Sequence, residues 1–342
     1  MLIERKRVAT LPLAYAIAVH DSARGKRVLC AAQGNAGCIG FDARDGSGVE
    51  QVWGEPGGTM SLVPLNGEEE FLATNGFYTG FVAEHSTIVH VKRNGDGGFD
   101  CETVVELPYL HRFRVMEAAG ETWIIGTTLC DAKDFKDDWS RPGRIYVGKY
   151  VPGQAFAFRK IGPAIFKNHG MYVGPFANKG QVAIVTGVEG AFVVEPPERA
   201  GGEWSIRPLL GGEISELQPY DIDGDGEEEL IVIEKFHGDR LAVYKKRGDS
   251  YESIYSYPVA WGHALWCGEV FGVRSLLIGY VSANAALMLL QRRNDAEKFS
   301  LLPTLIDDRQ GYNTIDVWAD GDAFRIYAAC RNDDIMLYTL RR

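Results

Sequence analysis

The feature that most constrains the fold of this chain is a repeated unit of four short apolar segments. Runs rich in Val, Ile, Leu, Phe and Tyr alternate with clusters of Gly, Asn and Asp about every eight to twelve residues, and hardly any window has helical spacing. Aligned with one another, the runs define a unit of about 45 to 58 residues, seen most clearly over residues 215–259 and 263–306. Four strands in a repeat of this length are typical of a β-propeller blade.

Seven copies of the unit fit in the 342 residues. The last copy begins at Asn313 and contains only three strands, and the missing strand is available in residues 3–11, IERKRVATL. Because unpaired sheet edges promote aggregation, we expect this N-terminal segment to complete the last sheet and close a ring. The sequence therefore predicts an all-β fold, a seven-bladed β-propeller with four-stranded blades, that forms a single domain over residues 1–342. Two separate β-domains are the alternative.

Composition narrows the range of partners. A formal net charge of -10 argues against nucleic acid, because phosphate backbones are bound by basic surfaces. No apolar run approaches the roughly 18 residues of a membrane-spanning helix, and residues 1–20 lack the apolar core and cleavage site of a signal peptide. We therefore expect a cytoplasmic protein that binds neither nucleic acid nor membranes, with its six cysteines reduced. The sequence leaves the oligomeric state open.

Three histidines occupy matching places in different copies of the repeat. His111, His169 and His263 each stand at the start of a blade, 13 residues before an apolar residue of the second strand. The first strand of each blade lines the axis of a propeller, so equivalent residues converge there. Converging neutral imidazoles suit a divalent transition metal such as Zn or Mn, and equally suit a general base flanked by orienting groups. The alternative is that each histidine only bonds neighbouring backbone and fills the channel.

Further polar side chains are expected on the same face. Tyr78 and Tyr312 are candidate acids, and Arg112 and Lys235 are candidate partners of a substrate carboxylate. Five more residues are expected to contact substrate: His85, His237, Asn75, Arg331 and Asn313. The longest insertion, residues 127–144, is expected either to cover the site as a wall or lid or to be a surface loop without a role.

The segment DIDGDGEEEL, residues 221–230, has the spacing of a calcium loop. Asp221, Asp223, Asp225 and Glu229 place carboxylates around one point, while the two glycines permit the tight turn. The segment falls between the first and second strands of its blade, on the face opposite the histidines, so the expected role of a bound Ca2+ is structural. An acidic turn without an ion is the alternative.

The same segment resembles the acidic DxDGDG turn of FG-GAP or VCBS propeller repeats. The sequence WGHALWCGEVFGVRSLLIGY, residues 261–280, is similar to a blade start in the propeller of the aldos-2-ulose dehydratase family, in which the histidine faces a metal-containing pocket that dehydrates a keto sugar. By architecture, the chain also resembles seven-bladed polysaccharide lyases, which abstract the proton next to a uronate carboxylate. These resemblances imply a site at His263, extended to His169 and His111 by blade equivalence.

Both of these enzyme families carry out β-elimination on sugars, and this chemistry is the preferred hypothesis for the chain. A metal or Arg112 would stabilise the enolate, while a histidine removes the α-proton from a sugar or a uronic-acid-containing oligosaccharide. The alternatives are a non-catalytic scaffold that binds a glycan or protein, and a hydrolase with a carboxylate pair such as Asp137 and Glu189. The sequence contains no GxSxG, P-loop or HExxH motif.

Overall fold

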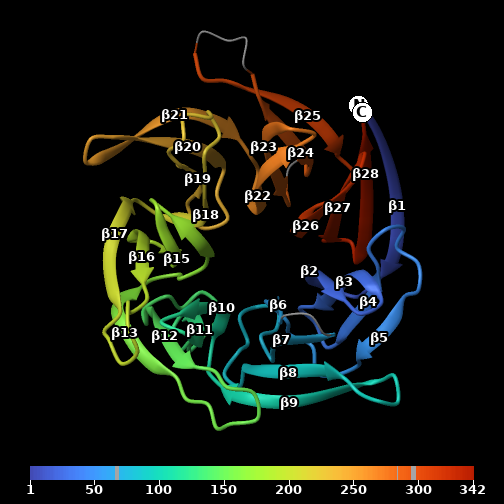
Figure 1. The fold of residues 1–342 in the computed structure, drawn as a ribbon, viewed down its shortest axis with the longest axis vertical. Coiled ribbons are helices and arrows are strands. Elements are labelled where there is room, and N and C mark those ends of the chain that lie inside the picture. Colours follow the sequence, from blue (N-terminus) through green and yellow to red (C-terminus); the bar gives the residue numbers. More distant parts are fainter. Residues whose placement is uncertain (66–68, 283, 294–297) are drawn as a thin grey trace. The chain divides into compact units, whose positions relative to one another are not determined.

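The computed structural model describes residues 1–65, 69–282, 284–293 and 298–342. Within these ranges the regular structure consists of strands, arranged as seven four-stranded sheets with antiparallel neighbours (Figure 1). The predicted all-β, seven-bladed β-propeller is therefore confirmed. None of the described segments is a helix long and apolar enough to cross a membrane.

The chain divides into two compact units. Unit 1 comprises Met1–Leu107, His263–Gln291 and Leu302–Arg342, and unit 2 comprises Pro108–Gly262 and Arg292–Leu301. The expectation of a single domain over residues 1–342 stays a prediction.

Unit 1 holds four of the sheets, apart from three strand-end residues that belong to unit 2. Two of these sheets consist of β2 (Ala14–Ser22), β3 (Gly25–Ala32), β4 (Cys38–Asp42) and β5 (Glu50–Trp53), and of β6 (Leu62–Pro64), β7 (Glu70–Asn75), β8 (Thr87–Arg93) and β9 (Phe99–Glu106). The other two consist of β22 (Gly262–Val270), β23 (Val273–Tyr280), β24 (Leu287–Arg292) and β25 (Leu301–Asp307), and of β26 (Tyr312–Asp320), β27 (Ala323–Cys330), β28 (Asp334–Arg341) and β1 (Leu2–Thr10).

The N-terminal strand completes the last of these sheets. Strand β1 pairs antiparallel with β28, from Leu2 opposite Arg341 to Thr10 opposite Asp334. In Figure 1 the blue β1 runs along the red β28, with the two chain ends side by side. The pairing gives the backbone groups of β28 partners on both sides, because β27 lies on its other edge. The predicted closing strand is therefore confirmed.

Unit 2 holds the three remaining sheets. The first consists of β10 (Leu110–Ala118), β11 (Glu121–Thr128), β12 (Gly143–Lys149) and β13 (Arg159–Ile165). The second consists of β14 (Met171–Phe176), β15 (Lys179–Gly187), β16 (Gly190–Glu195) and β17 (Ser205–Gly211). The third consists of β18 (Ile214–Tyr220), β19 (Glu229–Glu234), β20 (Arg240–Arg247) and β21 (Ser250–Pro258).

The second and third strands carry most of the core of each sheet. All eight residues of β27 are buried, whereas the outermost strand β17 has no buried residue. An inner strand is covered on both faces, so it consists of a continuous apolar run rather than an alternation. Within unit 2, for example, Ile125 and Ile145 of the first sheet share a core cluster with Ala183 of the second.

A β-bulge interrupts the pairing at the start of several first strands. The register shifts at His111 in β10, at Ser215 in β18 and at Asn313 in β26. A bulge places two residues opposite one and re-aims a side chain, which is why bulges are common beside functional sites. These three side chains therefore leave the strict alternation that the rest of each strand follows.

Candidate functional site

The blade-start histidines of unit 2 each bond the backbone of the next sheet. The Nδ1 atom of His111 lies 3.2 Å from the carbonyl oxygen of His169, and Nδ1 of His169 lies 3.3 Å from that of Ser215. A carbonyl oxygen only accepts, so both Nδ1 atoms carry the proton and donate it. The Nε2 atom of each neutral ring is therefore the one with a lone pair, the atom that a base or a metal ligand uses.

Unit 1 repeats this arrangement at a different blade start. The Nδ1 atom of His263 donates to the carbonyl oxygen of Asn313, and Nδ2 of Asn313 donates in turn to the carbonyl oxygen of Ala14 at 2.8 Å. The Nε2 atom of His263 lies 3.3 Å from the hydroxyl of Tyr15, whose ring stands edge-on to the imidazole. The convergence of His263 with the histidines of unit 2 stays a prediction.

Within unit 2, His169 also contacts His237. Their Nε2 atoms lie 3.3 Å apart, and the loop between β19 and β20 brings His237 to this point in a left-handed conformation, with φ of 50°. Left-handed backbone costs a non-glycine residue about 1 kcal/mol or more and persists where the surroundings impose it. The His111 ring also packs against that of His169, with ring centroids 4.6 Å apart. Three imidazoles thus meet around His169, which is 1% exposed.

A carboxylate that the sequence analysis missed supports this group. Oε1 of Glu216 lies 3.1 Å from Nδ1 of His169 and 3.6 Å from Nη2 of Arg112. A signal for Glu216 exists in the repeat, because Arg112 follows His111 and Glu216 follows Ser215 at the same bulge. We refer to His111, Arg112, His169, Glu216 and His237 as the histidine site.

The environment keeps the buried His111 imidazole neutral. Burial holds the pKa of His111 well below its usual range, and the neighbouring Arg112 and His169 lower it further. Desolvation disfavours a charged ring, so His111 donates from Nδ1 and keeps Nε2 unprotonated at neutral pH. His111 therefore offers a neutral imidazole nitrogen, which is the form that binds metals and accepts protons.

An aromatic wall stands beside the histidine site. It consists of Trp139, Phe236 and Trp261: the Phe236 ring lies 5.2 Å from that of His169 and 5.6 Å from that of Trp139, and the Trp261 ring lies 5.3 Å from that of His237. Lys133 Nζ lies 3.3 Å above the Trp139 ring. Trp139 belongs to the predicted insertion over residues 127–144, so this part of the loop reaches the site. Aromatic faces with adjacent ammonium groups suit a ring-shaped anionic ligand.

Two residues predicted to lie at the functional site, Tyr312 and Asn75, are buried and hydrogen-bonded to other side chains of unit 1. Tyr312 is 0% exposed, and its hydroxyl lies 3.0 Å from that of Tyr338 within the core of unit 1. Its proposed role as a catalytic acid is therefore not supported, because a substrate has no access to it. Asn75 is also buried, and its Oδ1 accepts a hydrogen bond from the Thr59 hydroxyl at 3.1 Å.

The remaining predicted contact residues lie nearer the surface. His85 is exposed and its Nδ1 lies 3.2 Å from Oε1 of Glu106. Tyr78 is half-buried and bridges to Val82, while Lys235 and Arg331 are exposed. Nothing in these contacts assigns a substrate to them, so their roles stay predictions.

The acidic turn lies between β18 and β19, as predicted, and its carboxylates surround an ammonium group. Nζ of Lys245 lies 2.6 Å from Asp223, 2.6 Å from Asp225 and 2.7 Å from Glu229. Calcium binding at this turn stays a prediction that must be weighed against this contact.

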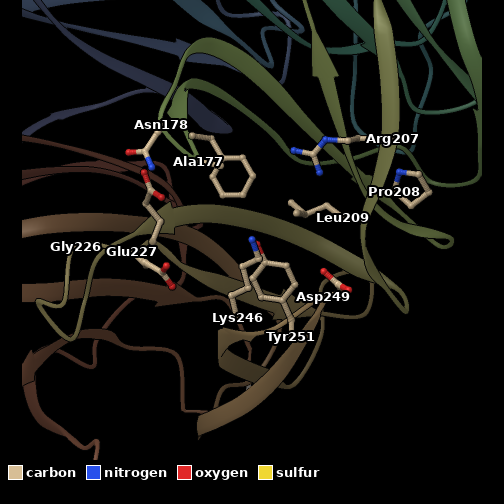
Figure 2. Close-up of a pocket in the computed structure, with 12 residues that line it drawn as sticks. Ala177, Asn178, Arg207, Pro208, Leu209, Gly226, Glu227, Lys246, Asp249 and Tyr251 are labelled. Carbon is tan, nitrogen blue, oxygen red and sulfur yellow. The ribbon is translucent and has the colours of Figure 1, made fainter.

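A cavity of about 370 Å³ lies near the acidic turn, between the second and third sheets of unit 2 (Figure 2). Its lining includes Phe176 and Arg207 from one sheet and Gly226, Lys246 and Tyr251 from the other. No member of the histidine site lines it. The repeat pattern does not predict this cavity, because it depends on how two sheets pack.

No protein-family model matches the sequence, and no curated protein matches it. Two solved structures are similar. A candidate 6-phosphogluconolactonase from Bacteroides uniformis matches with a TM-score of 0.55 and 10% identity, over 94% of this chain and 90% of that chain. Sqt1 from Saccharomyces cerevisiae matches with a TM-score of 0.55 and 7% identity, over 99% of this chain and 98% of that chain. At such identities the likeness concerns the fold alone, and together with the seven four-stranded sheets it identifies the chain as a seven-bladed β-propeller.

Proposed function

We propose that the histidine site carries out β-elimination on a sugar acid or a uronic-acid-containing oligosaccharide, as a carbohydrate-active lyase or dehydratase. The observation that carries this proposal is the pair of Nε2 atoms of His169 and His237, 3.3 Å apart, in a site where Glu216 contacts both His169 and the buried guanidinium of Arg112. Elimination next to a carboxylate needs a base for the α-proton and positive charge for the enolate that forms. The histidine site holds both.

In this proposal His237 is the base through Nδ1, because His169 keeps its proton on Nδ1 and the hydrogen bond between the two Nε2 atoms is therefore donated by His237. It is the most exposed of the three imidazoles, while His169 and Glu216 stand behind it in a chain of contacts at 3.3 Å and 3.1 Å. The carboxylate of Glu216 stabilises the positive charge that His169 and His237 share once a proton is taken up. The electron pair of the broken C–H bond forms the new double bond, the bond to the β-oxygen breaks, and the imidazolium can return its proton to the leaving oxygen.

The residues also fit a transition metal. Two nitrogen ligands at about 2.1 Å from a tetrahedral ion lie about 3.4 Å apart, close to the observed Nε2 separation. Nδ1 of His169 bonds a carbonyl and a carboxylate, as metal-bound histidines commonly do. A Zn or Mn ion held by His169 and His237 would supply a Lewis acid that makes the α-proton more acidic.

The aromatic wall favours a sugar over a small acid. Trp139, Phe236 and Trp261 can pack against the apolar face of a pyranose ring, and the Lys133 and Lys167 ammonium groups attract an acidic substituent. A lactonase reaction, the activity for which one fold neighbour is named, would need a water nucleophile at the same place. The elimination product differs, because its double bond is conjugated with the carboxylate and absorbs ultraviolet light.

The test combines metal analysis with a substrate panel. Purified wild type, His169→Ala, His237→Ala and, as a matched control, His90→Ala are analysed by inductively coupled plasma mass spectrometry and assayed on uronic-acid oligosaccharides. His90 lies on β8 in unit 1, where it bonds Glu70. We expect ultraviolet-absorbing product from wild type and His90→Ala, with a loss of about 100-fold or more in the two site variants. If no panel member is eliminated and the site variants match wild type in ligand binding, the proposal is rejected in favour of a non-catalytic scaffold.

A further inference from the structure

The acidic turn of unit 2 contains its own cation. The Lys245 side chain projects from β20 into the turn, where Nζ contacts Oδ2 of Asp223, Oδ2 of Asp225 and Oε1 of Glu229. An ammonium group has three protons, so three carboxylate acceptors satisfy it completely. Lys245 is 8% exposed and Glu229 is fully buried. The Lys245–Glu229 part of the contact is therefore shielded from water, while the Asp225 carboxylate lies at the surface.

The rest of the turn is already arranged as it would be around an ion. Asp221 accepts hydrogen bonds from the backbone N–H groups of Gly224 and Gly226, at 2.7 Å and 3.2 Å. Oε2 of Glu229 accepts from the N–H groups of Ile222 and Asp223, at 3.1 Å and 3.3 Å. The backbone thus holds both oxygens of Asp221 and one oxygen of Glu229, and the other Glu229 oxygen, Oε1, faces Lys245.

Calcium and the Lys245 ammonium cannot share this place. Calcium requires six to eight oxygen ligands at about 2.3 to 2.6 Å, and three of the nearest oxygens here are committed to Nζ at hydrogen-bond distance. A divalent ion among the same oxygens would also face a positive charge at very short range. The residues therefore do not fit a calcium ion while Lys245 is present.

Charge balance agrees with this geometry. Burial disfavours the charged form of Lys245, but hydrogen bonds to the three carboxylates outweigh burial and raise its pKa. Lys245 in turn lowers the pKa of Asp225. The ammonium form is the one that the turn stabilises, so Lys245 carries its charge at neutral pH.

We propose that Lys245 is a built-in replacement for calcium in this turn, so that the protein folds without calcium and acquires a calcium site only when Lys245 is removed. Because the ammonium group is covalently attached to the chain, it fills the turn whatever the concentration of free calcium. The inference is independent of the histidine site, whose residues it does not involve.

The test measures thermal unfolding in EDTA and in millimolar CaCl2, with calcium binding followed by isothermal titration calorimetry. Lys246→Met is the matched control, because Lys246 is the next residue of β20 and is exposed. We expect wild type and Lys246→Met to show equal Tm in both buffers and no binding heat. We expect Lys245→Met to unfold about 5 °C lower in EDTA, because three carboxylates lose their cation, and to recover in calcium.

One further variant and one further condition show whether calcium binds at this turn. Lys245→Met combined with Asp225→Asn removes one of the oxygens, so calcium should no longer raise its Tm. If Lys245→Met does not fold in EDTA, it is refolded with calcium, and recovery of the native circular dichroism supports the proposal. A wild type that purifies with calcium and loses Tm in EDTA would overturn it, as would a Lys245→Met variant that calcium neither binds nor stabilises.

Discussion

Tyr338→Phe is expected to destabilise the protein several times more than Tyr312→Phe, although each change removes one hydroxyl. The two side chains form a buried chain with Asp307 in unit 1: the Tyr338 hydroxyl donates to Oδ2 of Asp307 at 2.7 Å, and the Tyr312 hydroxyl lies 3.0 Å from that of Tyr338. Because the Tyr338 proton goes to the carboxylate, Tyr312 is the donor between the two hydroxyls. Burial raises the pKa of both phenols, so both keep their protons.

The loss of unfolding free energy in each variant depends on which groups lose a hydrogen-bond partner. Tyr312→Phe removes the end of the chain and leaves the bond to Asp307 intact, at a cost of about 1 kcal/mol. Tyr338→Phe removes a hydrogen bond to a buried carboxylate, about 1.5 to 3 kcal/mol, and also leaves the Tyr312 hydroxyl without an acceptor, another 1 to 3 kcal/mol or so. The single variant Tyr338→Phe should therefore lose about 3 to 5 kcal/mol of unfolding free energy.

The double variant Tyr312→Phe/Tyr338→Phe tests these estimates of the loss in unfolding free energy. Tyr312→Phe in the Tyr338→Phe background removes the stranded hydroxyl, so the double variant should be more stable than Tyr338→Phe alone. Urea unfolding followed by tryptophan fluorescence measures all three values. Additive losses, or a Tyr312→Phe cost equal to that of Tyr338→Phe, would refute the proposed chain. Near-wild-type turnover in Tyr312→Phe would separately confirm that this phenol is not the catalytic acid.

Three other outcomes are expected. Glu216→Gln should weaken binding of Zn or Mn about 10- to 100-fold by isothermal titration calorimetry, because it removes the carboxylate charge that faces Nδ1 of His169. It should also lower the Tm, because the buried Arg112 guanidinium loses a carboxylate partner. Burial lowers the pKa of His20 in the folded protein, and its hydrogen bond with the Asp21 carbonyl only partly offsets this effect. Below about pH 6.5 the unfolded chain therefore binds more protons than the folded one, so the free energy of unfolding decreases as the pH falls. His20→Gln should flatten this part of the pH–stability curve. Gly143→Ala should cost about 2 kcal/mol or more in urea unfolding, because its Cβ would lie 1.8 Å from the Thr128 carbonyl oxygen, whereas Gly180→Ala, with open space around it, should be near neutral.

Much of the fold could be predicted because the same pattern of strands and turns occurs seven times in the sequence. Apolar runs between turn residues define strands, and a three-stranded last copy requires a strand from elsewhere, which β1 supplies. The fixed offset of 13 residues also predicts that His111 and His169 occupy equivalent places, and their rings do lie together. Local spacing is sufficient for these conclusions, because each depends only on the position of a residue within its own repeat.

The errors arise where a single-residue shift changes the face of a strand. Tyr312 and Asn313 are adjacent, and the bulge at Asn313 decides which of them leaves the core. The sequence does not reveal a bulge, so it predicts Tyr312 at the site although the side chain is buried. The role of Lys245 is hidden for a related reason: its charge is evident in β20, but the direction in which it points depends on how β20 pairs with β19.

The repeat itself is not the strongest argument for function. His111, His169 and His263 each donate from Nδ1 to a backbone carbonyl, and Asn313 does the same with its amide, so this bond alone is a structural device that joins one sheet to the next. A histidine with a purely structural role requires only this hydrogen bond to a backbone carbonyl. His169 differs, because its Nδ1 also faces the carboxylate of Glu216 and its Nε2 faces a second imidazole that a left-handed loop residue delivers. Joining two sheets requires neither the Glu216 contact nor the His237 contact. These two additional contacts are the reason to propose a catalytic role for His169 and His237 rather than a purely structural one.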